Sequence, residues 1–247
     1  MDTKRILDKL DSYFAKNDYN GAERHLKYWL DEAKASNDER AELLLCNELI
    51  GLSRKTNNEA QTFFYTDLAL DALKRLDMEF SISAATTYIN VATAYKAFGR
   101  AVDSLPLFDK ALNIYTADLD KNDPRFGGLY NNMALTYVDL GEFEKAYRSF
   151  DLALSVMANA EKGELEQAIT HLNIASALEA EKGLVDADEE IQQRLIKAAE
   201  LLDIYTDDDD GYYAFVCEKC ASVFGYYGHF MYENQLKERV KRIYEGT

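Results

Sequence analysis

Two cysteines and a histidine near the C-terminal end are the first residues whose types and spacing could bind a metal ion. Cys217 and Cys220 have the Cys-x2-Cys spacing of many zinc and redox sites, and His229 follows them. A structural zinc site needs four converging ligands, and only three candidates are present. Both cysteines also fit the apolar face of a helix, where cysteine behaves as a small hydrophobe. We therefore expect buried cysteines and no metal.

An acidic run just before these cysteines resembles the start of a calcium loop. Asp207–Asp210 is followed by Gly211, but the first and twelfth ligand positions would then be Thr206 and Cys217. Cysteine cannot replace the bidentate glutamate that closes such a loop. A solvated turn with helix-capping aspartates is the better interpretation.

The remaining side chains form no recognisable catalytic motif. His25, His171 and His229 are scattered, with no serine or cysteine at a suitable spacing, and there is no glycine-rich phosphate loop. We expect neither enzymatic activity nor a cofactor.

Three asparagines are better placed to bind a ligand. Asn90, Asn132 and Asn173 lie at intervals of 132 − 90 = 42 and 173 − 132 = 41 residues, each opposite the apolar face of a predicted helix. An asparagine side chain both donates and accepts hydrogen bonds, so it can bond a peptide backbone twice. Small neighbouring side chains leave room for such a ligand. The alternative is that each asparagine ties neighbouring helices together.

The charge of the chain restricts the class of partner. Its 247 residues include 28 basic and 44 acidic side chains, which gives a net charge of −16. Such a surface repels the phosphates of nucleic acids and anionic membranes. It attracts a basic protein or peptide, although plain solubility also explains the excess of acidic residues.

The chain is expected to be cytoplasmic. With Cys46, the sequence has three cysteines, too few for a disulfide framework. Met1–Leu10 has the pattern of an amphipathic helix and differs from a signal peptide. No apolar run approaches the roughly 20 residues of a membrane span.

A repeat predicts the elements that position the asparagines. The central alanines of three similar segments are spaced 111 − 69 = 42 and 153 − 111 = 42 residues apart. Before each of two segments, Tyr88–Gly99 and Tyr130–Gly141 form a helical apolar face that ends at a glycine, which tolerates the left-handed cap conformation. One helix pair cannot bury its apolar face alone, so neighbouring pairs must stack.

The resulting prediction is one all-α domain over residues 1–247, built from six antiparallel helix pairs. Pro106 suggests that its helix begins near Asp103, which would keep the proline in the first turn. The predicted helices are 3–16, 20–35, 39–56, 59–76, 81–98, 102–118, 124–140, 143–160, 164–182, 187–204, 209–225 and 229–245.

The repeat resembles the tetratricopeptide repeat (TPR), a right-handed superhelical α-solenoid. The copy that matches best is Tyr130-x2-Met133-Ala134-x2-Tyr137-x3-Gly141-Glu142-Phe143-x2-Ala146-x3-Phe150-x2-Ala153. The usual repeat has about 34 residues. The longer period resembles the subclass found in kinesin light chains and in Leu-Gly-Asn-type polarity adaptors. The match is clearest over 80–118 and 124–160, and the ends 1–37 and 208–247 are divergent.

The resemblance implies a protein- or peptide-binding adaptor or scaffold that uses its concave face. In the long-period adaptors the matching asparagines bind a peptide backbone, and Asn47 and Asn131 are weaker candidates for the same role. The residues expected on the peptide-binding face are Asn90, Asn132, Asn173, Thr86, Thr93, Asn131, Leu135 and Ser176.

Two other functions are consistent with the same fold. Bacterial TPR regulators respond to short signalling peptides, so a regulatory or sensor protein is the first. A self-associating scaffold is the second, because an aromatic stretch near the C-terminus would favour a homodimer if it were exposed. Its members are Tyr212, Tyr213, Phe215, Phe224, Tyr226, Tyr227, Phe230, Met231 and Tyr232.

Overall fold

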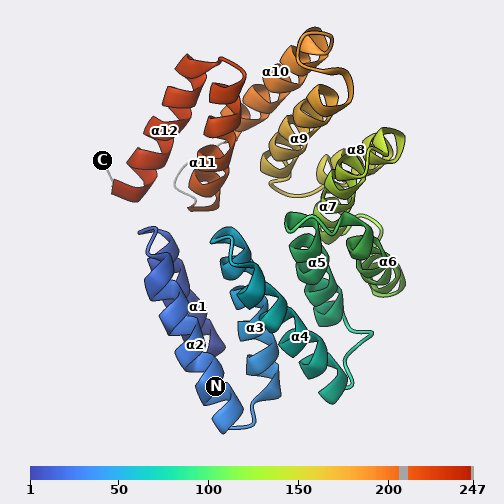
Figure 1. Cartoon of the computed structure of the whole chain (residues 1–247). Helices are drawn as coiled ribbons and strands as arrows, with labels where there is room; N and C mark the ends of the chain where they lie inside the picture. The colour runs from blue at the N-terminus through green and yellow to red at the C-terminus, as the bar shows by residue number, and fades with distance from the viewer. Residues whose placement is uncertain (206–210, 246–247) are drawn as a thin grey trace. The chain divides into compact units, whose positions relative to one another are not determined.

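A computed structural model describes residues 1–205 and 211–245, and every regular element within them is an α-helix (Figure 1). The chain divides into two compact units, Met1–Leu119 and Asp120–Thr247. The first unit contains α1 (Thr3–Phe14), α2 (Tyr19–Ala35), α3 (Glu39–Lys55), α4 (Glu59–Arg75), α5 (Ile82–Ala97) and α6 (Ala101–Asp118). The second contains α7 (Arg125–Asp139), α8 (Phe143–Met157), α9 (Glu164–Lys182), α10 (Asp188–Ile204), α11 (Gly211–Tyr226) and α12 (Phe230–Glu245).

The predicted all-α class and the twelve predicted helices are confirmed over the described residues, with boundaries that agree within a few residues. The first two residues of the helix predicted at 209–225 lie outside the described residues, as does the acidic run Asp207–Asp210 with Thr206. The prediction of a single domain stays a prediction.

Helices pair in chain order inside each unit. In the first unit α1 packs on α2, α3 on α4 and α5 on α6, and in the second α7 packs on α8, α9 on α10 and α11 on α12. The first helices of successive pairs are also neighbours, because α3 contacts α5, α7 contacts α9, and α9 contacts α11. The asparagines therefore lie on rows of adjacent first helices.

The turns inside these pairs depend on residues that adopt a left-handed backbone. Gly99, Gly141 and Gly183 have φ of 76°, 71° and 82°, and they follow one another at intervals of 42 residues. Asn57 occupies the same place one repeat earlier with φ 55°, which asparagine tolerates better than most residues. After Asn57, Gly99 and Gly141 the next helix begins two residues later, which keeps the two helices of a pair antiparallel and in contact. After Gly183 the connection is longer, and α10 begins at Asp188.

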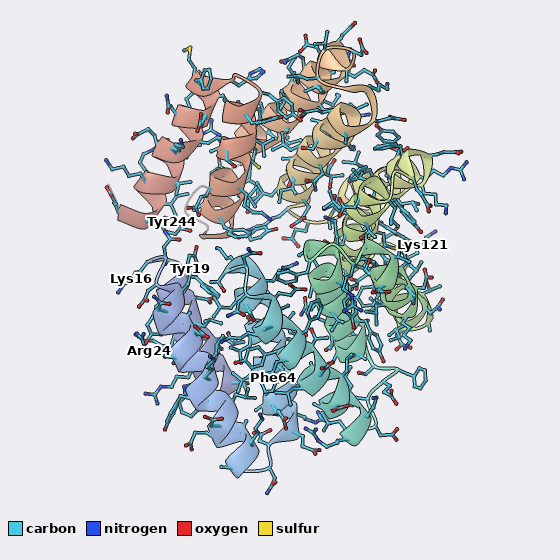
Figure 2. The ribbon with its side chains drawn as sticks, in the orientation of Figure 1. Lys16, Tyr19, Arg24, Phe64, Lys121 and Tyr244 are labelled. Carbon is cyan, nitrogen blue, oxygen red and sulfur yellow. The ribbon has the colours of Figure 1, made fainter. Side chains whose placement is uncertain are left out.

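The core is built from the repeated small and aromatic side chains. Phe108 and Phe150, one repeat apart, are fully buried. The repeat alanines Ala92, Ala134 and Ala175 on first helices are also fully buried, so two helix backbones can approach closely there. Other aromatic side chains are exposed, and Phe64 on α4 is one of them (Figure 2).

The predicted start of the sixth helix is wrong. α6 begins at Ala101, not near Asp103, and Pro106 lies inside it. The two-residue turn Gly99-Arg100 leads directly into the helix, and Ala101 is buried. A proline at this position removes one backbone hydrogen bond, but packing of α6 on α5 keeps the preceding turn helical.

Candidate peptide-binding face

The asparagines of the first unit form a bridge between α3 and α5. The Asn90 side-chain amide donates to Oδ1 of Asn47 at 2.8 Å. Asn47 in turn donates from Nδ2 to Oγ1 of Thr87 at 3.0 Å and to the Leu43 carbonyl at 2.9 Å. Asn47 is thus a hub that joins two neighbouring first helices.

A corresponding bridge joins α7 and α9 in the second unit. The Asn173 side-chain amide donates to Oδ1 of Asn131 at 3.1 Å. Asn131 lies 173 − 131 = 42 residues before Asn173, one repeat away. Each unit therefore contains one asparagine pair that spans two stacked helix pairs.

Asn132 behaves differently from the other two predicted asparagines. Its amide donates to the Gly128 carbonyl at 2.9 Å, one turn earlier in its own helix α7. Among the described residues it has no bridging bond, so its side chain makes no inter-helix contact of the Asn90 or Asn173 kind.

The hydroxyl groups on this face are bonded to their own helices. Thr93 donates to the Ile89 carbonyl at 2.6 Å, Thr86 to Ile82 at 3.4 Å, and Ser176 to Leu172 at 3.3 Å. Their hydrogens are used, but their oxygens keep lone pairs that can accept. A ligand would therefore meet acceptors at these three positions.

The asparagines keep both kinds of hydrogen-bonding capacity. A primary amide offers two N–H donors and an oxygen that accepts, and the described bonds of Asn90, Asn132 and Asn173 each use one N–H. One donor and the carbonyl oxygen remain at each residue. One N–H and one C=O are what a peptide unit in an extended chain presents along an edge.

The residues of this face are all at least partly accessible to solvent. Asn90, Asn131, Asn132, Asn173 and Leu135 are half-buried. Thr86 and Ser176 are exposed, and Thr93 is half-buried. We call the members of this set within one unit its first-helix face: Asn90, Thr86 and Thr93 in the first unit, and the other five residues in the second.

Charged residues on α3 were not identified as site residues from the sequence. Glu48 lies next to Asn47, and burial, together with the charge of Asp11, raises the pKa of its carboxyl. Burial alone lowers the pKa of Arg54, which lies in the last turn of α3. The available signal in the sequence was their closeness to Asn47 along the same helix. Glu48 is the next residue, and Arg54 follows 54 − 47 = 7 residues, or about two helical turns, later.

The residues that suggested metal or redox chemistry are in the core. Cys46, Cys217 and Cys220 are reduced and buried, and burial raises the pKa of Cys46 and Cys220 to about 12. The expected burial of Cys217 and Cys220 is confirmed. Residues 1–205 and 211–245 contain no group of three histidine, cysteine or acidic side chains arranged for a metal ion.

The aromatic C-terminal stretch is divided between core and surface. Tyr213 and Phe224 are buried, and Tyr227 and Tyr232 pack partly against the same core. The exposed members are Tyr212, Phe215, Tyr226, Phe230 and Met231.

Within the described residues, none of the helices has the length and apolar character that a membrane span requires.

Stacked antiparallel helix pairs with a 42-residue period, glycine turns and buried repeat alanines define a TPR-like helical-repeat fold. Solved structures have the same fold. BtubC (BKLC) from P. vanneervenii is similar with a TM-score of 0.68 at 19% identity, over 83% of this chain and 82% of that protein. A Podosopora anserina protein described as a kinesin light chain with nearly identical TPR-like repeats has a TM-score of 0.55 at 14% identity, over 82% and 94% of the two chains.

Sequence comparison adds no relative. No family model matches the chain, and no curated protein matches it either. The TPR-like fold predicted from the repeat is confirmed by structure.

Proposed function

We propose that this protein is a peptide-binding adaptor that holds an extended segment of a partner on its first-helix face. The observation that carries the proposal is the spare capacity of Asn90, Asn132 and Asn173, each with one donor and one acceptor left on a face of small side chains. Such groups bind a backbone whatever its side chains are. Each unit has its own set of these residues, and the proposal applies to each unit by itself.

The partner segment is expected to be basic. The net charge of −16 steers cationic chains toward the surface. Because such steering is screened by salt, association should slow as ionic strength rises. The likeness to the kinesin light chain and BtubC structures supports the helical-repeat fold on which the proposal rests, and it names no ligand.

Asn132 gives the sharpest test. Its side chain bonds only within α7, so Asn132→Ala should leave stability within about 0.5 kcal/mol of the wild type. Affinity for a peptide selected from a random display library should fall by about tenfold, the equivalent of about 1.4 kcal/mol. Fluorescence anisotropy with the labelled peptide measures this change.

Asn159→Ala is the matched control, since Asn159 donates to the Ser155 carbonyl at 2.8 Å in the same way but lies at the end of α8, outside the face. N-methylation of single backbone amides in the peptide should weaken binding more than alanine substitution of its side chains. Equal affinity of wild type and Asn132→Ala, with no loss on N-methylation, would contradict backbone recognition.

Self-association is a second candidate, and the exposed aromatics favour it. Tyr226, Phe230 and Met231 are 68%, 63% and 81% exposed at one end of the second unit. Replacing Phe230 and Met231 together by Ser should convert a dimer into a monomer in sedimentation velocity runs, because apolar contacts at such an interface would be lost. A wild-type chain that sediments as a monomer at all concentrations would exclude this candidate.

A further inference from the structure

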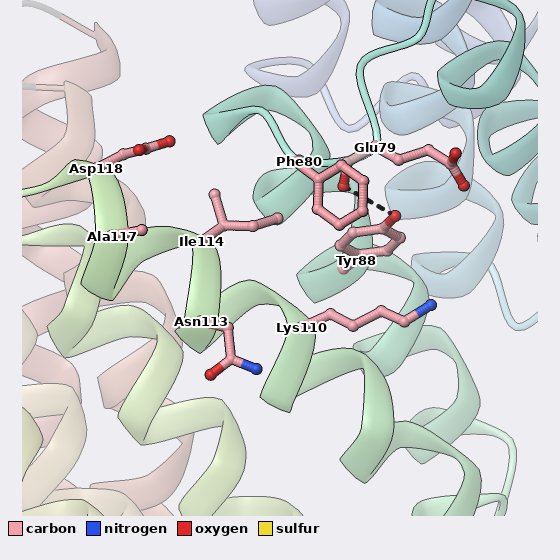
Figure 3. Close-up of a pocket in the computed structure, with 8 residues that line it drawn as sticks. All are labelled: Glu79, Phe80, Tyr88, Lys110, Asn113, Ile114, Ala117 and Asp118. Carbon is pink, nitrogen blue, oxygen red and sulfur yellow. Dashed lines mark hydrogen bonds between the residues drawn. The ribbon is translucent and has the colours of Figure 1, made fainter.

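A pocket lies on the first unit, separate from the first-helix face. The connection between α4 and α5 closes over α5 and α6 to form a cavity of about 430 Å³ (Figure 3). This volume is within the range of about 300–1,000 Å³ typical of ligand pockets. None of the residues of the first-helix face lines it.

The pocket has an apolar lining, and on one side a hydrogen bond holds Tyr88 in place. Tyr88 is buried, and its hydroxyl donates to the Glu79 carbonyl at 3.2 Å. Ile114 on α6 is also buried, and Ala117 continues the floor. Phe80 stands at the edge with 86% of its surface exposed. Covering this exposed phenyl ring with a ligand removes apolar surface from water, which favours binding.

The charges around the pocket favour a cation. Glu79 and Asp118 contribute two carboxylates and Lys110 one ammonium group, which leaves an excess of one negative charge. Asp118 is the last residue of α6, and the last turn of this helix contains no basic side chain. The partial negative charge of the helix C-terminus is therefore uncompensated by its own sequence.

The aromatic rings favour the same ligand. Lys110 Nζ lies 5.3 Å from the centroid of the Tyr88 ring, so this ring already attracts a cation within the protein. Figure 3 shows Phe80 and Tyr88 with Lys110 at one side of the pocket and Asp118 at the other, beyond Ile114 and Ala117. The pocket thus has aromatic rings on one side and a carboxylate on the other, and both favour a cation.

We propose that this pocket binds an arginine or lysine side chain of a partner protein, together with the apolar residue next to it in the partner sequence. The apolar residue packs on Ile114 and Phe80, and the cation lies between Phe80 and Asp118. The pocket is a separate surface from the first-helix face. It can be occupied whether or not that face binds a peptide.

Methyl NMR tests the proposal with defined probes. The Ile114 δ1 methyl and the Ala117 methyl report on the floor during titration with Ac-Leu-Arg-NH2. Both signals should shift and saturate at concentrations up to about 10 mM, above a Kd of about 1 mM for so small a ligand. Ac-Leu-Glu-NH2 should bind at least fivefold more weakly.

Phe80→Ala should weaken Ac-Leu-Arg-NH2 by about fivefold or more, because one cation–π contact alone accounts for about 2- to 5-fold at an exposed site. Asp118→Asn should weaken it by about 2- to 5-fold. Phe64→Ala is the matched control, since Phe64 is an exposed phenylalanine of the same unit outside the pocket. Its Kd should equal that of the wild type.

Three results would overturn the proposal. One is the absence of any Ile114 or Ala117 shift at the highest peptide concentration. Another is tighter binding of Ac-Leu-Glu-NH2 than of the arginine peptide. The third is an Ile114 shift that depends on protein concentration alone and disappears in Phe80→Ala, which would identify a second copy of the chain as the occupant.

Discussion

Asn47 accepts a hydrogen bond from Asn90 across 2.8 Å, and this bond connects α3 to α5 at positions one repeat apart. Asn47 uses both of its amide hydrogens as well, toward Thr87 and Leu43. The residue that appeared as the weaker candidate in the sequence therefore has the larger structural role.

Asn47→Ala should destabilise the first unit by about 1–2 kcal/mol, because Asn90 and Thr87 lose their partner in a half-buried site. Urea denaturation measures the change. Asn113→Ala, at an exposed asparagine of α6, should stay within about 0.5 kcal/mol of the wild type. Similar losses in the two variants would show that the bridge adds nothing to stability.

Adjacent glycines at the start of α7 should respond in opposite ways. A Cβ added at Gly127 would collide with the Met157 side chain of α8, whereas one at Gly128 would meet nothing within 4 Å. Gly127→Ala should therefore cost about 1–3 kcal/mol. Gly128→Ala should stabilise by up to about 1 kcal/mol, since alanine is the better helix former.

Thermal unfolding followed by circular dichroism measures both glycine variants. Two equal and favourable shifts in Tm would mean that α7 and α8 are not in close contact at Met157.

His171 makes stability depend on pH. Burial, with added repulsion from Arg194 and Lys197, lowers the pKa of His171 from 6.5 to about 4. The unfolded chain binds the proton as pH falls below 6.5, while the folded chain does so only near 4. Stability from this residue is thus complete above pH 6.5 and is lost between pH 6.5 and 4, by about 3 kcal/mol at most.

The check on His171 is the slope of unfolding free energy against pH. His171→Gln should flatten the slope between pH 6.5 and 5 relative to the wild type. Carboxylates titrate equally in both proteins, so the difference isolates the imidazole. Parallel slopes would mean that His171 has the same pKa in the folded and the unfolded chain.

Phe108 and Phe150 should be equally sensitive to truncation, because they occupy matching buried positions of two repeats. Replacement of either by Ala should cost about 3–5 kcal/mol through lost burial and the cavity left behind. Chemical denaturation with each unit monitored separately checks this. Phe64→Ala, at a side chain 55% exposed, provides the surface comparison and should change stability far less.

The sequence by itself determined the elements and their order. The 42-residue spacing of Gly99, Gly141 and Gly183 is a local signal, because a left-handed turn favours glycine whatever surrounds it. Apolar periodicity likewise decides which face of each helix is buried. This is why the twelve predicted helices and the TPR-like fold are confirmed. Individual ends differ by a few residues, as at the start of α6, where Pro106 lies inside the helix.

Only the tertiary structure decided which partner each asparagine has. Asn90 and Asn173 reach another asparagine on the neighbouring helix, whereas Asn132 turns back to its own. A hydrogen bond requires two atoms within about 3 Å, and that depends on how closely and at what angle two helices pack. The repeat pattern is identical to within a residue at all three positions, so it cannot encode this difference. The same holds for Phe80, whose exposure beside a pocket results from the path of the α4–α5 connection.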